Sequence, residues 1–166
     1  MSERNTVVYQ RVVDYKGLIN VPGVFRVIED WLRQNGYSKK ELRNEEEIFE
    51  SGKQIILELL PYRLLNPEAK LEIHLVINFR KLQEAEVEDG VRKKKLWKGE
   101  VTITTDAYVV TDLENKWDNN AVMLFMKTIF DKFIYKVYSS HYDKMVGEDV
   151  DRLLLEVRSY LNLQRF

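Results

Sequence analysis

Apolar and polar residues alternate over two long segments of the chain, 71–79 and 101–109. Such alternation is typical of a strand that has one face on a core and the other face in water. Asp89-Gly90 stands between the two segments, so the pattern predicts one long antiparallel β-hairpin. The two apolar stripes are Leu71, Ile73, Leu75, Ile77 and Phe79 on the first strand, and Val101, Ile103, Thr105, Ala107 and Val109 on the second.

The loop of this hairpin decides which residues face each other across it. A two-residue loop at Asp89-Gly90 would place the two apolar stripes on opposite faces of the sheet. We therefore predict a three-residue loop, Glu88-Asp89-Gly90, with glycine at positive φ in a bulge, and this loop pairs Ile77 with Val101. Beyond residue 80 both strands carry few apolar side chains, which predicts an arm that projects from the body.

Residues 40–49 fit two interpretations. Their charges would suit an exposed helix, but Leu42 and Ile48 alone make a poor helical stripe. We favour a polar edge strand that turns at Glu50-Ser51-Gly52, since charged side chains protect a sheet edge from pairing with another chain. The other predicted elements are a strand over 6–19, a helix opened by Asn20-Val21-Pro22-Gly23 and stopped near Gly36, a strand over 54–60, a helix over 121–138 and a last helix after Gly147.

Together these elements predict an α+β fold in one domain, residues 1–166. We expect a curved antiparallel sheet of about five strands, packed against a short N-terminal helix and two C-terminal helices. The element order is β-α-β-β-β-β-α-α. With 45% hydrophobic residues, the chain can bury a substantial core.

Charge and cysteine content exclude several classes of function. The net charge is −1, so no overall field attracts nucleic acid or anionic lipid, and we expect no nucleic acid partner. The chain has no cysteine, which excludes disulfides and thiol chemistry. The N-terminus has no apolar signal core, and the most apolar segment, 121–138, carries Lys127 and Asp131 among its charges, so we expect no membrane span and a cytoplasmic protein.

The candidate catalytic chemistry is sparse. His74 falls on the polar face of its strand, where a solvated histidine is far commoner than a ligand. Ser140, His141 and Asp143 are adjacent in sequence, but adjacency does not provide the geometry that a triad needs. The glycines form no phosphate-binding loop, and two histidines without cysteine make a metal site improbable, so we expect no cofactor and no metal.

The order of strand, helix, antiparallel strands and long C-terminal helix resembles the helix-grip fold of START and Bet v 1-like proteins. In this resemblance the segment from Asn20 to Leu32 corresponds to the entry helix, and 121–138 corresponds to the helix that the sheet grips. The family has six strands after its entry helices, whereas we predict four here. The resemblance implies a pocket for an apolar ligand between the sheet and the long helix.

Three functions follow as hypotheses. The first is a non-enzymatic domain that binds an apolar or lipid-like small molecule in a cavity; a packed core explains the same residues without a ligand. The second is a protein-interaction or assembly module that uses the charged arm 80–98. The third is an enzyme without metal or cysteine chemistry. The cavity residues are Ile55, Leu57, Leu59, Met126, Phe130 and Phe133, and the arm residues are Arg92, Lys94, Lys95 and Trp97.

Overall fold

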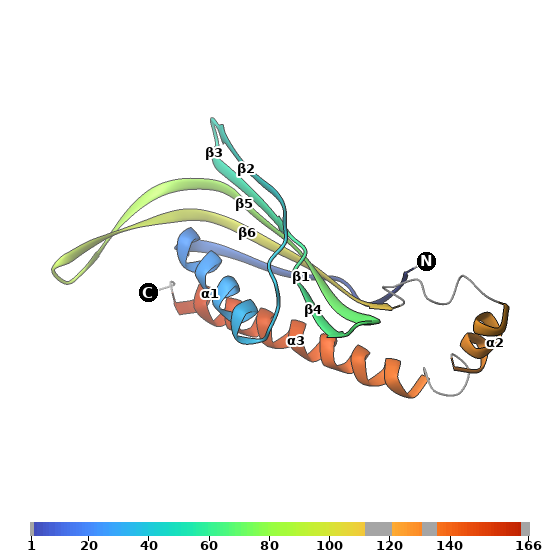
Figure 1. The fold of residues 1–166 in the computed structure, drawn as a ribbon. Coiled ribbons are helices and arrows are strands. Elements are labelled where there is room, and N and C mark those ends of the chain that lie inside the picture. The colour runs from blue at the N-terminus through green and yellow to red at the C-terminus, as the bar shows by residue number, and fades with distance from the viewer. Residues whose placement is uncertain (1, 112–120, 131–135, 164–166) are drawn as a thin grey trace.

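The computed structural model describes residues 2–111, 121–130 and 136–163. It contains one antiparallel sheet with helices against one face (Figure 1). The predicted α+β class and the antiparallel sheet are confirmed. The elements are β1 (Glu3–Ile19), α1 (Val21–Gln34), β2 (Glu41–Phe49), β3 (Gly52–Leu59), β4 (Tyr62–Asn66), β5 (Ala69–Asp89), β6 (Arg92–Thr111), α2 (Ala121–Phe130) and α3 (Lys136–Leu163).

The long hairpin β5–β6 lies at the centre of the sheet, whose strand order is β1-β6-β5-β3-β2. The sheet has six strands rather than the predicted five, because β4 also pairs with β5 beyond the end of β3. Pro61 separates β3 from β4, as expected for a residue that cannot donate to a strand ladder. Its carbonyl still accepts a hydrogen bond from the Ile73 amide at 2.9 Å, so β4 continues along the same neighbour.

The sheet curves around α1 and α3, which cover its inner face (Figure 1). Both predicted stripes of the hairpin point to this face, and every residue of the 71–79 stripe is fully buried. One continuous apolar core joins the inner face to the two helices. The residues that α3 contributes to it are Val146, Val150, Leu153, Leu154, Val157 and Leu161.

The helix α1 begins and ends where the sequence predicts. The Asn20 side chain accepts a hydrogen bond from the Gly23 amide at 3.1 Å, so it caps the first turn, and Pro22 lies within that turn. Gly36 follows the helix with φ of 74°, a conformation that favours glycine. The predicted edge strand is also confirmed, since β2 lies at the edge of the sheet with every residue exposed.

The predicted register of the hairpin is wrong. Ile77 faces Ile103 rather than Val101, and the turn consists of Gly90 and Val91, because Asp89 pairs with Arg92. Between residues 71 and 80 the pairing of β5 with β6 keeps both apolar stripes on one face of the sheet, as the sequence predicts. A bulge in β5 reconciles this pairing with a two-residue turn.

The bulge lies at Lys81 and Leu82, which together face Gly99 on β6. Lys81 adopts φ of 53°, and the extra residue turns the even-numbered Leu82 into the core, where it is buried. A Cβ on Gly99 would lie 2.8 Å from the Arg80 carbonyl oxygen, and a Cβ on Gly52 would lie 2.8 Å from the Leu82 carbonyl oxygen. Glycine on both neighbouring strands therefore leaves room for the bulge.

The predicted C-terminal helices are also corrected. Of the helix predicted over 121–138, residues 121–130 form α2, which lies away from the sheet, and residues 136–138 belong to the start of α3 (Figure 1). The helix against the sheet is α3, which runs without a break through Gly147. A helical glycine costs roughly 1 kcal/mol relative to alanine, and the packing of α3 outweighs this cost.

A buried ion cluster holds α3 to the rest of the domain. Asp149 on α3 is fully buried and accepts a hydrogen bond from the Tyr37 hydroxyl at 2.7 Å. Its carboxylate also pairs with Arg63 of β4 at 3.2 Å and with Arg152. Burial, and then the hydrogen bond to Asp149, raise the pKa of Tyr37 far above its usual value. The cluster links the segment after α1, the strand β4 and the helix α3.

Candidate functional site: the outer face of the sheet

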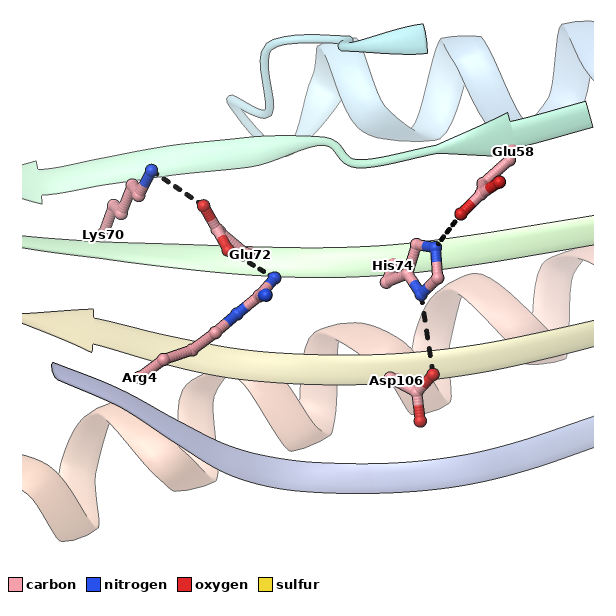
Figure 2. A network of polar contacts seen from close by, with 6 residues as sticks. All are labelled: Arg4, Glu58, Lys70, Glu72, His74 and Asp106. Atoms are coloured by element: carbon pink, nitrogen blue, oxygen red, sulfur yellow. Dashed lines mark hydrogen bonds and ion pairs between the residues drawn. The ribbon is translucent and has the colours of Figure 1, made fainter. Parts of the chain in front are cut away.

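The outer face of the sheet, opposite α1 and α3, carries the polar residues that alternate with the buried stripes. Figure 2 shows six of them on four strands, lying in two clusters. The clusters are Glu58, His74 and Asp106, and Arg4, Lys70 and Glu72. This face brings together ionisable groups that are far apart in the sequence.

In the first cluster His74 lies between two carboxylates, one from each neighbouring strand. Its Nε2 is 2.6 Å from Glu58 Oε1, and its Nδ1 is 3.6 Å from Asp106 Oδ2. The histidine and the two acids are mostly covered, with side-chain exposures of 15–28%. When the ring is protonated, both nitrogens donate toward carboxylates, so the cluster joins β3, β5 and β6 through charge.

This geometry does not support catalysis by His74. A general base needs a free nitrogen that faces a nucleophile, but Nε2 already faces the Glu58 carboxylate. The acids lie on opposite sides of the ring rather than around one point (Figure 2). Among the described residues no group of three His, Cys, Asp or Glu side chains could hold a metal ion. The cluster therefore fits cross-strand pairing best.

In the second cluster two cations cover one carboxylate. Glu72 lies 2.7 Å from both the Arg4 guanidinium and the Lys70 ammonium, and it is buried, with 7% of its surface exposed. The Arg4 guanidinium also lies 3.8 Å from the centre of the Tyr108 ring. Burial, followed by the charge of Asp106, raises the pKa of Tyr108. The cluster binds β1 to β5 across β6.

A pocket of about 400 Å³ lies on the same face, where the arm leaves the body. Arg80 donates to the Thr102 hydroxyl at 3.0 Å, and that hydroxyl donates to Asp14 at 2.7 Å. The Glu100 carboxylate lies 3.4 Å from the Lys16 ammonium. The hydrogen bond from Lys16, and then the charge of Lys81, lower the pKa of Glu100. The pocket is open to solvent and its charges are internally paired.

Among the described cavity residues, the three on β3 and Met126 on α2 do not come together (Figure 1). Ile55, Leu57 and Leu59 are buried on the inner face of β3, facing Phe79, Ile77 and Leu75 of β5. Met126 lies on α2, where 57% of it is exposed. The Phe130 side chain and Phe133 lie outside the described residues.

The predicted arm residues lie in two environments. Arg92, Lys94 and Lys95 are exposed on β6, and Lys93 of the same basic run lies 3.9 Å from Glu86. Trp97 instead lies at the root of the arm, half-buried against the core, with the Lys53 ammonium 5.2 Å from its ring centre. Trp97 therefore anchors the arm, whereas Arg92, Lys94 and Lys95 are exposed to solvent.

Sequence reasoning missed the pairing of His74 with Glu58 and Asp106, and it missed the buried Asp149. Alternation did place His74 correctly on the polar face. Asp106 also alternates onto that face, but the wrong register hid the fact that it stands directly opposite His74. For Asp149, the apolar stripe of α3 extends back to Val146, and this spacing could have indicated a helix that continues through it.

Comparison with known proteins adds no identity: no protein-family model matches the chain, and neither does any curated protein. No helix in the described ranges is both long enough and apolar enough to cross a membrane. Function is therefore inferred from the residues and their geometry.

Proposed function

We propose that this domain is a non-enzymatic protein-interaction module that binds a partner with the part of its arm beyond the bulge, residues 83–98. The observation that carries this proposal is the pair of unoccupied strand edges on the arm. The pairing of β3 with β5 ends at Leu82, and the pairing of β1 with β6 ends at Trp97. Beyond these residues the described part of the chain supplies no further strand to either edge.

The arm contributes little to the stability of its own domain. Most of its residues are exposed, and a two-stranded ribbon is at best marginally stable in water. Free backbone edges can accept an added strand, which is a common mode of peptide recognition. The β6 edge is basic over 92–95, and it would attract an acidic partner, whereas Glu84, Glu86 and Glu88 on β5 would repel one.

The test is charge reversal on the arm. Arg92, Lys94 and Lys95 are replaced together by glutamate, and partners are captured at low salt with the original chain and the variant. The variant should lose a partner while its melting temperature changes little, because exposed ion pairs contribute only about 0.2–1 kcal/mol each.

A matched control reverses three exposed cations of the body, Arg33, Lys40 and Lys144, and so changes the net charge equally. The control should retain the partner. The proposal fails if the arm variant retains every partner, or if arm and control variants lose partners equally.

One observation favours a second candidate function, a ligand held between the sheet and α3. Thr105 lies on the inner face with its hydroxyl fully buried, and it has no hydrogen-bond partner among the described residues. A bound molecule with a polar group would satisfy this hydroxyl. The curvature of the sheet around α3 supports a helix-grip-like architecture, with α3 as the gripped helix. A fatty-acid probe should then bind the folded domain and raise its melting temperature; no change in melting temperature at saturating probe would end this candidate.

A further inference from the structure

The edge strand β2 carries a run of acids whose charge is opposite to that of the arm. Glu45, Glu46 and Glu47 are consecutive in β2, and every residue of this strand is exposed. In the strand order of the described residues β2 lies at the end of the sheet, with β3 beside it. Its outer backbone edge can therefore accept a further strand. Charged side chains discourage pairing with a strand of like charge and favour pairing with a strand of opposite charge.

The arm offers a strand of opposite charge. The pairing of β6 with β1 ends at Trp97, so in the described chain no strand lies on that side of β6 over residues 92–96. The cations of the arm, residues 92–95, are all exposed within this segment. The segment is close in length to an ordinary strand of roughly five or six residues. The arm is thus matched by an acidic edge of the same chain.

The two edges face away from each other within one chain. The strand order β1-β6-β5-β3-β2 places the outer edge of β2 at one end of the sheet, whereas the exposed edge of β6 faces the side on which β1 lies. Figure 1 also shows the arm and the hairpin β2–β3 extending from the body in different directions. Pairing of these edges therefore requires two copies of the chain.

One antiparallel register matches both the charges and the apolar side chains of the two edges. In this register the tip of the arm brings Val91 beside Ile48 of β2. Val91 is fully exposed and Ile48 is 83% exposed, so the contact covers two large apolar side chains that the domain itself leaves in water. Each of the three consecutive acids then faces a cation. The charged pairs are Arg92 with Glu47, Lys93 with Glu46, and Lys94 with Glu45.

Ion pairs within each copy do not prevent this contact. Three of them involve residues of the two edges, and in each the carboxylate is about half-exposed or more. Exposed pairs of this kind contribute little, so their members can exchange partners. Pairing of like edges is disfavoured, since two β2 strands would place acids against acids and two arms would place cations against cations. The three internal pairs are Lys93 with Glu86, Arg43 with Glu45, and Lys53 with Glu46.

We propose that the arm of one copy adds a strand to the β2 edge of a second copy. This inference rests on the proposed function of the arm and names a second copy of the chain as the partner. Each copy presents both an arm and a β2 edge, so the contact joins two different surfaces. Its repetition produces rings or open chains of copies.

Sedimentation velocity of the full chain and of charge-reversed variants tests the proposal. The original chain should form species heavier than the monomer, and their average mass should rise with protein concentration and fall with added salt. Two variants reverse one edge each, and either reversal should weaken self-association at least about tenfold, because every charged pair becomes repulsive. The β6 variant carries Arg92→Glu, Lys93→Glu and Lys94→Glu, and the β2 variant carries Glu45→Lys, Glu46→Lys and Glu47→Lys.

A double variant that carries both sets of substitutions should associate again. Its charged pairs are attractive with their signs exchanged, and its net charge equals that of the original chain. A matched control reverses three exposed acids of the body by Glu68→Lys, Glu148→Lys and Glu156→Lys, and so changes the net charge as the β2 variant does. The control should associate as the original chain does. Equal loss of association in the control and in the β2 variant would overturn the assignment to β2.

Carbodiimide cross-linking provides a second measurement that requires no substitution. The reagent joins a lysine amine to a carboxylate in contact with it, and a mixture of isotope-labelled and unlabelled chain identifies links between copies. The cross-linked peptides should join residues 93–95 of one copy to residues 45–47 of another. A dimer fraction that is linked between copies only at other positions would overturn the proposal.

The outcomes separate this inference from the proposed function on which it rests. A chain that stays monomeric at every concentration, while its β6 variant loses a different captured protein, would overturn the inference and leave the proposed function standing. A chain that stays monomeric and captures no partner through the arm would defeat both. Self-association that the β6 variant retains in full would also overturn the inference, because the arm would then not make the contact.

Discussion

Replacement of Asp149 by alanine tests the ion cluster that holds α3 to the domain. The carboxylate is fully buried and has three partners, Tyr37, Arg63 and Arg152. Removing one member of a buried, hydrogen-bonded ion pair costs about 3–5 kcal/mol, because the remaining charge loses its partner without regaining water.

The structure places the expected cost at the lower end of that range. The Arg63 side chain is 23% exposed and still donates to the Asn35 carbonyl at 3.0 Å, so part of its charge stays solvated after the substitution. We expect Asp149→Ala to lower the free energy of unfolding by about 3 kcal/mol. For a chain of this length, that loss corresponds to a fall in melting temperature of roughly 6–12 °C.

Urea denaturation and thermal melting of the variant provide the measurement. Asp151→Ala is the control, because Asp151 lies on the same helix and also pairs with an arginine, Arg11, but is 64% exposed. The control should cost no more than about 1 kcal/mol. A loss below about 1 kcal/mol for Asp149→Ala itself would refute the buried cluster.

A double-mutant cycle with Tyr37→Phe isolates the hydrogen bond within the cluster. The single change at Tyr37 should cost about 1.5–3 kcal/mol, since the hydroxyl donates to a charged acceptor. The two substitutions together should cost less than the sum of the separate losses, because both remove the same contact. Simple additivity would show that the two side chains do not interact.

Three further substitutions test other features of the fold. Thr105→Val should leave the free energy of unfolding unchanged or raise it by up to about 1 kcal/mol in urea denaturation, because the Thr105 hydroxyl is buried without a hydrogen-bond partner among the described residues. A loss of more than about 1 kcal/mol would show that the hydroxyl does have a hydrogen-bond partner. Gly99→Ala should cost about 1–3 kcal/mol, since the new Cβ would overlap the bulge, whereas Gly147→Ala, which has open space around it, should stabilise α3 by roughly 0.5–1 kcal/mol. Burial, and then the Asp149 hydrogen bond, raise the pKa of Tyr37, so the folded state keeps a proton that the unfolded state loses above about pH 10. Stability should therefore fall as the pH rises beyond that point, by up to about 1.4 kcal/mol per pH unit, and the fall should be smaller in Tyr37→Phe when both are denatured at a series of alkaline pH values.

Local patterns in the sequence predicted the parts of the fold that depend on neighbouring residues. Alternation over 71–79 and 101–109 identified the central strands and the residues that face the core. The cap at Asn20 and the glycine at position 36 marked both ends of α1. These features depend on residues close together in the sequence, because backbone preferences and side-chain periodicity are properties of short segments.

The errors arose where a distant part of the chain decides the local structure. The bulge at Lys81 depends on Gly52 and Gly99, which lie on the two neighbouring strands rather than nearby in the sequence. The sequence predicts that the last helix begins only after Gly147, but α3 runs through this residue because contacts on either side of it, including the Asp149 cluster, hold the helix. Of the candidate site, the sequence located the basic residues of the arm, whereas the pairing on the outer face required the correct register.

The bulge also makes the reach of the arm adjustable. The pairing of the body and the pairing of the arm are set on opposite sides of Lys81, so neither constrains the other. Deletion of two residues from each strand of the arm, for example Glu86 and Val87 with their partners Lys95 and Lys94, would shorten the ribbon by roughly 7 Å and keep the remaining pairs and their faces matched. The contact of Ile77 with Ile103 in the body would stay unchanged. Insertions and deletions in matched pairs are therefore a route by which relatives of this chain could span different distances on one scaffold.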